Sequence, residues 1–187
     1  MNQIAGSDTA TTESTTVVWL NGAFGAGKTT VSRRLAATFT DSVTVDPEEV
    51  GSILRSCLQR ISARRDFQEW GAWRRVSVEL IASIATEVPG SLIVVPQTIL
   101  VEEYWDEISN GLSSRVRLLP ISLHVEPDVH SQRVHADQEE RDALRWRLHR
   151  YSDYQQADWI SRRFNVVDNN MESIELTVDS VAKLIRG

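Results

Sequence analysis

The chain has 187 residues, 41% of them hydrophobic and 25% charged, which is enough for a single domain with its own core. Its formal net charge of −6 argues against nucleic acid as the main partner, because no excess of cations is available to displace counterions. A lone cysteine excludes an internal disulfide. No apolar run reaches the roughly 18 residues of a membrane span, and the N-terminal residues lack the pattern of a signal peptide. Together these observations predict a cytoplasmic protein without a transmembrane segment.

The beginning of the chain divides into a tail and the start of a domain. Residues 1–14 are small and polar, so we expect a disordered tail. From residue 15 to 187, strand-like and helix-like segments alternate, which predicts one α/β domain with a mostly parallel sheet and helices on both faces. The first strand is expected at residues 16–20, which are β-branched and apolar.

A phosphate-binding loop (P-loop) is predicted directly after this strand, because residues 22–29 match G-x-x-x-x-G-K-[ST] without a mismatch and a helical pattern follows. Glycines let backbone N–H groups surround a phosphate, Lys28 would reach the β- and γ-phosphates, and the Thr29 hydroxyl would bind Mg²⁺. The alternative is a glycine-rich turn that binds nothing. The expected nucleotide-binding residues of this segment are Gly22, Ala23, Phe24, Gly25, Ala26, Gly27, Lys28, Thr29 and Thr30.

Asp46 follows the second expected strand, residues 42–45, and precedes a helical pattern that runs to Ile61. One interpretation is structural: Asp46 is a good N-cap, with Pro47 at the first helical position and Glu49 two residues later. The other is functional, because ligands of open α/β sheets bind beyond the carboxyl ends of the strands. A carboxylate there would orient an acceptor hydroxyl and take its proton, or hold Mg²⁺ through water. The two interpretations are compatible.

Residues 66–88 are expected to form one long helix with an apolar stripe. Core packing is the default explanation of such a stripe. The first half, however, combines Phe67, Trp70 and Trp73 with Arg74, which would give an aromatic and cationic surface able to line an acceptor pocket. Both interpretations stay open, and Phe67, Trp70 and Arg74 are candidate substrate-binding residues.

The third strand, residues 91–95, is a continuous apolar run, as expected for a strand buried on both faces. A P-loop hydrolase usually carries an acidic residue at the end of this strand, but here the chain continues with Pro96, Gln97 and Thr98. Mg²⁺ would therefore depend on Thr29, phosphate oxygens, water and Asp46. We predict that Gln97 and Thr98 belong to the binding site of the acceptor substrate. A helix with its end near Gly111 is expected next.

A fourth strand at residues 118–125 and a helix at residues 127–136 precede a segment rich in arginine. One interpretation is a solvated helical surface with ion pairs between neighbouring turns. The other is a mobile lid, at about residues 137–150, that brings arginines onto the phosphates. We favour the lid, with Arg133 and Arg141 as its catalytic candidates.

A fifth strand at residues 164–167 ends in Asp168 and Asn169. These two residues would either contribute to a loop over the adenine or be ordinary turn residues. Thr177 is a candidate cap for the last helix. No guanine-reading N-K-x-D pattern is present, which argues against a GTPase.

Several of these segments together resemble the tunicamycin-resistance ATP-binding proteins of bacteria, within the wider group of P-loop small-molecule and nucleotide kinases that includes chloramphenicol phosphotransferases. The resemblance implies a three-layer fold with a five-stranded parallel sheet, ATP with Mg²⁺, and a nucleoside-like antibiotic or related metabolite as ligand. By position, Asp46 matches the acceptor-side aspartate of those kinases, and Arg55 matches a substrate-side arginine. The segments that carry the resemblance are residues 18–29, 46–48, 51–55, 66–68, 92–96, 98 and 168–169.

The sequence therefore predicts an ATP-dependent phosphotransferase that acts on a hydroxyl of a small molecule, with tunicamycin as one candidate. Two alternatives stay open. The protein could use ATP to close around an antibiotic and sequester it without chemistry, or it could be a nucleotide or nucleoside kinase of central metabolism.

Overall fold

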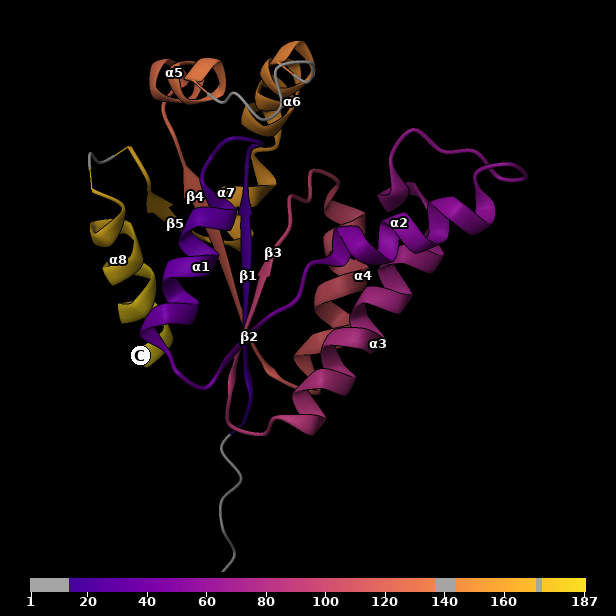
Figure 1. Ribbon diagram of the computed structural model, residues 1–187, viewed down its shortest axis with the longest axis horizontal. Helices are drawn as coiled ribbons and strands as arrows, with labels where there is room; N and C mark the ends of the chain where they lie inside the picture. Colours follow the sequence, from indigo (N-terminus) through magenta and orange to yellow (C-terminus); the bar gives the residue numbers. More distant parts are fainter. Residues whose placement is uncertain (1–13, 137–143, 171–172) are drawn as a thin grey trace, which may run out of the picture.

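The computed structural model describes residues 14–136, 144–170 and 173–187. Its centre is a five-stranded sheet of strand order β2-β3-β1-β4-β5, in which every neighbouring pair is parallel (Figure 1). The predicted α/β fold of the kinase-type P-loop proteins is thus confirmed. The strands are β1 (Thr16–Gly22), β2 (Ser42–Thr44), β3 (Leu92–Pro96), β4 (Arg117–His124) and β5 (Asn165–Asp168).

The central strands are apolar along their whole length because both of their faces are covered. In β1, Val17 and Trp19 point into one core and Val18 and Leu20 into the other, and all four are fully buried. Side chains alternate between the faces of a strand, so a strand buried on both sides needs an unbroken apolar run. The same reasoning explains β3, whose residues Leu92 to Val95 are all buried.

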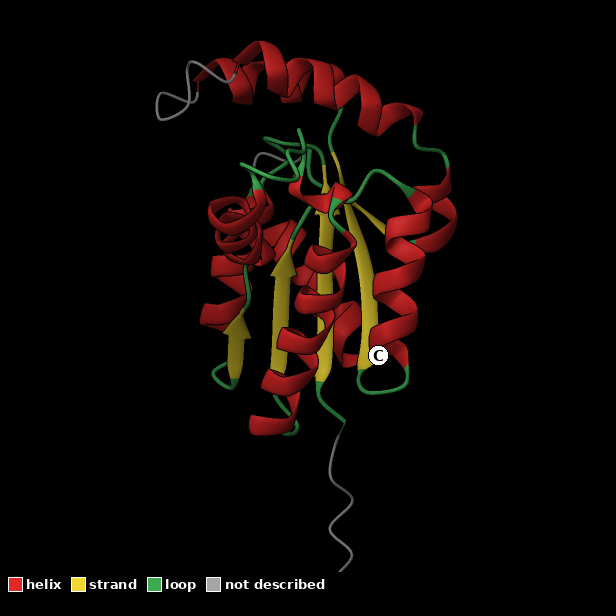
Figure 2. Cartoon of the chain, turned by 90° about the vertical axis from the view of Figure 1, so that its right-hand side faces the viewer, coloured by secondary structure: helices red, strands yellow, loops and turns green. Residues whose placement is uncertain are grey.

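Helices cover both faces of the sheet, which gives the three layers expected from the sequence (Figures 1 and 2). One group of helices contributes buried residues to the core that contains Val18 and Leu20, and a second group contributes buried residues to the core that contains Val17 and Trp19. The first group is α1 (Lys28–Thr38) and α8 (Ile174–Arg186). The second group is α2 (Pro47–Leu58), α3 (Gly71–Glu87), α4 (Glu102–Ser113) and α7 (Trp159–Arg163).

Two further helices, α5 (Pro127–Ala136) and α6 (Leu144–Gln156), lie beyond the carboxyl ends of the strands, at the top of Figures 1 and 2. They border the segment predicted as a lid. The centre of that segment, including Arg141, lies outside the described residues, as does nearly all of the predicted tail. Within the described ranges, no helix is both long and apolar enough to cross a membrane.

The expected long helix at residues 66–88 is interrupted, so that prediction was wrong at its start. A short 3-10 helix, η1 (Phe67–Glu69), is followed by extended backbone at Trp70, with φ −76° and ψ 116°, and α3 begins only at Gly71. Asp66 caps η1 by accepting a hydrogen bond from the Gln68 amide. The cap at Asp66 therefore determines the local backbone, although the aromatic residues that follow are spaced as in a continuous helix.

Two other predicted helix ends also differ from the structure. Helix α4 runs through Gly111 and ends two residues later, at Ser113. A Cβ at Gly111 would lie only 2.8 Å from Val78 Cγ1 on α3. The glycine is there for close helix packing and does not end the helix. Thr177 is not a cap either, since α8 begins at Ile174 and Thr177 is buried in its first turns.

Candidate active site

The loop between β1 and α1, predicted to bind phosphate, contains two glycines with left-handed backbone. Gly25 and Gly27 have φ values of 87° and 91°, which side-chain-bearing residues rarely adopt. A Cβ at Gly25 would also lie 2.7 Å from Val134 Cγ2 on α5. Gly27 is the N-cap of α1 and makes no side-chain cap hydrogen bond to that helix. The first N–H groups of a helix and its dipole favour an anion at this position.

Lys28 lies across this loop. Its Nζ donates to the carbonyl oxygens of Gly22 at 2.9 Å and Ala23 at 3.0 Å, and it lies 5.2 Å from the centroid of the Phe24 ring. The two neighbouring residues with hydroxyl groups, Thr29 and Thr30, are exposed at the start of α1. The cation and the hydroxyls thus lie at the same end of the helix as its first backbone amides.

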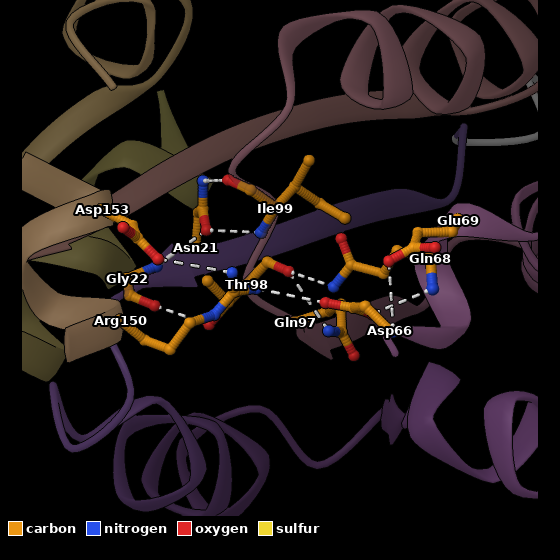
Figure 3. Close-up of polar contacts among 10 residues, drawn as sticks. All are labelled: Asn21, Gly22, Asp66, Gln68, Glu69, Gln97, Thr98, Ile99, Arg150 and Asp153. Carbon is orange, nitrogen blue, oxygen red and sulfur yellow. Dashed lines mark hydrogen bonds and ion pairs between the residues drawn. The ribbon is translucent and has the colours of Figure 1, made fainter. Parts of the chain in front are cut away.

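The base of the loop is fixed to the segment that follows β3 (Figure 3). Asn21 Oδ1 accepts hydrogen bonds from the amides of Gly22 and Ile99, and its Nδ2 donates to the Ile99 carbonyl. Thr98 Oγ1 donates to the Gly22 carbonyl at 2.7 Å. Thr98 is 2% exposed, so it supports the P-loop from below and offers little surface to a substrate.

A second set of contacts links α6 to the same segment (Figure 3). Arg150 on α6 donates to Asp66 Oδ2 at 3.1 Å and to Asp153 Oδ2 at 3.5 Å. Asp66 caps η1, and Gln68 of η1 donates from Nε2 to the Thr98 carbonyl at 2.8 Å. The lid-side helix is therefore joined to the P-loop through η1 and Thr98. The sequence analysis did not single out the pair of Arg150 and Asp66, because the two are 84 residues apart.

The far side of the loop is supported by Asn169. This residue is 1% exposed, donates from Nδ2 to the Ala26 carbonyl at 2.6 Å and accepts from the Thr177 hydroxyl at 2.8 Å. Arg133 of α5 donates to the Asn169 carbonyl at 2.8 Å. Asp168 is exposed, and its Oδ1 accepts from the Asn170 amide, which is the contact of an ordinary turn residue. Asn169 therefore lies beneath the loop and is not exposed for contact with a base.

His130 is a contributor that the sequence analysis missed. On α5, its Nε2 donates to the Phe24 carbonyl at 2.6 Å, and its ring stacks on Tyr151 of α6 with centroids 4.0 Å apart. The imidazole is buried between the P-loop and α6. No local pattern identifies it, because the contact joins residues that are 106 positions apart.

Asp46 has the predicted cap geometry. Its Oδ1 accepts from the Glu48 amide at 2.9 Å, and Pro47 occupies the first position of α2. The residue is exposed just after β2, so its carboxylate is open to a ligand at the carboxyl edge of the sheet. The cap is thus established, and the chemical role stays a prediction.

On the predicted acceptor side, Phe67 is half-buried and the exposed Arg55 places its guanidinium 5.9 Å from the Phe67 ring centroid. The expected aromatic and cationic surface does not extend further. Trp70 is 6% exposed, and its indole N–H donates a hydrogen bond to the Ser62 carbonyl. Trp73 is fully buried, and its indole N–H donates to the Pro47 carbonyl.

Arg74, also expected on that surface, is held by other residues. It forms an ion pair with Glu107 of α4 at 2.7 Å, donates to the Gln68 carbonyl and lies over the Tyr104 ring at 4.1 Å. The hydrogen bond from Arg74 lowers the pKa of the Glu107 carboxyl. Arg74 therefore joins α3 to α4 and η1. Of the predicted surface Phe67 stays partly accessible, with the separately predicted Arg55 beside it.

No protein-family model matches the chain, and no curated protein does either. Among solved structures, it is similar to the tunicamycin resistance protein of Deinococcus radiodurans, with 22% identity, 80% of this chain and 95% of that chain covered, and a TM-score of 0.56. A gluconokinase from Sinorhizobium meliloti has 19% identity, 91% coverage of both chains and a TM-score of 0.60. A sugar kinase from a Janibacter species has 18% identity, 93% and 95% coverage and a TM-score of 0.64. The chain thus has the fold of the kinase-type P-loop proteins.

Proposed function

We propose that the protein is an ATP-dependent phosphotransferase that acts on a hydroxyl group of a small molecule in the cytoplasm. The observation that carries this proposal is the geometry of the predicted P-loop: two left-handed glycines, the start of α1 at the N-cap Gly27, and Lys28 across the loop. The similarity in fold to kinases supports the same reaction class. A P-loop NTPase that acts on water would ordinarily have an acid after β3, and Gln97 stands there instead.

The residues present fit ATP with Mg²⁺. The amides at the start of α1 and the Lys28 ammonium would hold the phosphates, and the exposed Thr29 hydroxyl would be the protein ligand of the metal, with Asp46 reaching it through water. When bound, ATP with Mg²⁺ supplies the phosphoryl group and neutralises part of its charge. Among the described residues, no cluster of three or more acidic, histidine or cysteine side chains forms a separate metal site.

Within this arrangement the chain's own residues orient the acceptor and handle its proton. Asp46, at the edge of the sheet near the P-loop unit, accepts the proton of the attacking hydroxyl. Phe67 and Arg55 form a wall of the acceptor site. Arg133 and Arg141 are proposed to stabilise the charge of the transferred group from the lid side.

The lid, proposed at residues 137–150, has a direct test in amide hydrogen exchange. We expect exchange across α6 to slow when a non-hydrolysable ATP analogue is added, because nucleotide would hold α6 over the site. Helix α3, on the far side of the η1 segment, serves as the internal control. Equal exchange of α6 with and without the analogue would favour the solvated-surface alternative.

The acceptor is proposed to be a nucleoside-type antibiotic or a related metabolite. The tunicamycin resistance protein among the structural neighbours makes tunicamycin the first compound to test. The decisive experiment is an acceptor-dependent assay of ADP release, with mass spectrometry of the acceptor. Phosphorylated tunicamycin supports the proposal, whereas tunicamycin that binds only with ATP and stays unmodified indicates sequestration. Phosphorylation of a nucleoside or nucleotide alone would indicate a metabolic kinase.

A further inference from the structure

The short helix η1 is held against the base of the predicted P-loop. Gln68 of η1 donates from Nε2 to the Thr98 carbonyl at 2.8 Å, and the Thr98 hydroxyl donates to the Gly22 carbonyl at the start of the loop (Figure 3). Gln97, which is 1% exposed, donates from Nε2 to the same Thr98 carbonyl at 3.2 Å. The position of η1 is therefore tied to the loop by buried hydrogen bonds.

The side chain of Phe67 in η1 packs on α2, the helix that Asp46 caps. A Cβ at Gly51 of α2 would lie only 2.6 Å from Phe67 Cγ, so the ring rests directly on the helix where no side chain intervenes. The centroid of the ring is 5.2 Å from that of Trp73 on α3. Phe67, the proposed wall of the acceptor site, therefore lies where η1 holds it.

Asp66, the cap of η1, also carries its contact with α6. Oδ1 accepts from the Gln68 amide at 2.9 Å, and Oδ2 accepts from Arg150 Nη2 at 3.1 Å. The side chains of Arg150 and Asp66 are only 24% and 32% exposed, so solvent ions screen this pair less than a fully exposed one. One carboxylate thus holds the backbone of η1 and the arginine of α6 together.

The next residue of α6 is connected to the other end of the predicted P-loop. Tyr151 stacks on His130 of α5 with ring centroids 4.0 Å apart, and His130 donates to the Phe24 carbonyl at 2.6 Å. The Tyr151 hydroxyl donates to the Val125 carbonyl, at the end of β4, at 2.7 Å. Arg150 and Tyr151 therefore link the tip of the loop to η1 through two adjacent positions of one helix.

We propose that Arg150 and Asp66 are a positioning pair that couples the two ligands. A nucleotide at the P-loop biases α6 through His130 and Tyr151, and the ion pair passes this bias to η1 and the Phe67 wall. This inference rests on the proposed function and adds that nucleotide and acceptor strengthen each other's binding by the same factor. Coupling of this kind requires an element that both sites bias, and α6 with η1 is that element.

The first test measures the affinity of the full chain for tunicamycin by calorimetric titration, with and without a non-hydrolysable ATP analogue. In the wild type, we expect the analogue to tighten binding about fivefold or more. Asp66→Asn keeps a good cap and removes the charge that faces Arg150, so the tightening should fall below about twofold. The matched control is Asp153→Asn, which removes the longer contact of Arg150, at 3.5 Å, and should keep the wild-type coupling. Equal tightening in the wild type and Asp66→Asn would overturn the inference, because Asp66 would then be a helix cap only.

Amide hydrogen exchange tests the same link without an acceptor, and it alone decides if the wild type binds no tunicamycin. We expect the analogue to slow exchange at residues 22–30 and at residues 66–70 of the wild type. Arg150→Met should keep the protection of residues 22–30 and lose that of residues 66–70. Protection of both segments in Arg150→Met, or of residues 22–30 alone in the wild type, would overturn the inference and leave the proposed function standing. A wild type protected at neither segment would overturn the proposed function and the inference with it.

Discussion

The Lys28 ammonium and the Thr98 hydroxyl donate to the same atom, the carbonyl oxygen of Gly22, at 2.9 and 2.7 Å. This shared acceptor links Lys28, the lysine proposed to bind phosphate, to the segment that follows β3. When Lys28 turns toward a phosphate, Thr98 still satisfies the Gly22 carbonyl. The cost of moving the lysine would thereby be reduced, so we expect Thr98 to affect nucleotide binding without touching the nucleotide.

Replacing Thr98 by valine tests this relationship. Valine preserves the shape and removes the hydroxyl, so the Gly22 carbonyl would lose the hydrogen bond from Thr98 and, when Lys28 leaves, the one from Lys28 as well. We expect unfolding to become easier by about 1 kcal/mol and affinity for an ATP analogue to fall about threefold to tenfold. Urea denaturation and calorimetric titration measure the two effects. The matched control is Thr38→Val, whose exposed hydroxyl bonds within its own helix; identical nucleotide affinity in both variants would contradict the prediction.

Lys28→Ala should remove a charge from the β- and γ-phosphates and largely abolish turnover. The loss should exceed tenfold, which corresponds to about 1.4 kcal/mol of transition-state stabilisation. The fold should survive, because Lys28 is only partly buried and contacts loop carbonyls. Lys183→Ala provides the control, since Lys183 is the only other lysine and is exposed near the end of α8. A Lys28→Ala enzyme with a rate within about threefold of the wild type would refute the P-loop assignment.

For Asp46, a role as helix cap and a role as proton acceptor lead to opposite expectations for the stability and the turnover of its variants. Asp46→Asn keeps a good N-cap and should change stability by only a few tenths of a kcal/mol, whereas Asp46→Ala should cost about 1 kcal/mol. Loss of the general base should lower turnover about 100-fold in both variants, at the lower end of such effects, because a loose phosphoryl-transfer transition state needs little base assistance. Melting temperature and rate, measured on both variants, separate the roles. If the Asp46→Asn enzyme is active, Asp46 is not the proton acceptor and acts only as a helix cap.

The phenol of Tyr154 gives a prediction for alkaline pH. Burial raises the pKa of Tyr154 to about 12, and its hydroxyl pairs with Ser122. Because the unfolded phenol titrates near pH 10, the folded protein binds more protons between about pH 10 and 12, and stability is lost as pH rises through that range. From pH 9 to 11, the unfolding free energy of the wild type should fall by about 1 kcal/mol more than that of Tyr154→Phe. Parallel declines of the two proteins in urea denaturation would show that Tyr154 titrates normally.

The sequence was sufficient for the sheet and for the strand, glycine loop and helix at residues 16–38, because these follow from local signals. Buried parallel strands need unbroken apolar runs, and the G-x-x-x-x-G-K-[ST] pattern fixes a backbone shape over a few residues. Asp46 as a cap belongs to the same class, since a cap and its helix are neighbours in the chain.

The surroundings of the loop could not be predicted in this way. Helical spacing placed Trp70, Trp73 and Arg74 near one another but gave no information on which neighbours cover them, and the structure places both indoles in the core. His130 and Asn169 contact the loop from 106 and 143 residues away, so no window of the sequence contains both partners. Long-range packing determines these contacts, and only the folded chain brings them together.

The contact between Gly25 and Val134 has a consequence for how this protein can vary. A methyl group added at position 25 would meet Val134 Cγ2 at 2.7 Å, so the volumes available at these two positions compete for one space. Any alanine at position 25 would have to coexist with a smaller residue at 134, in addition to tolerating a φ of 87°. Position 25 in the loop and position 134 on α5 are therefore expected to vary together. A larger residue at position 25 would require a smaller residue at position 134 first.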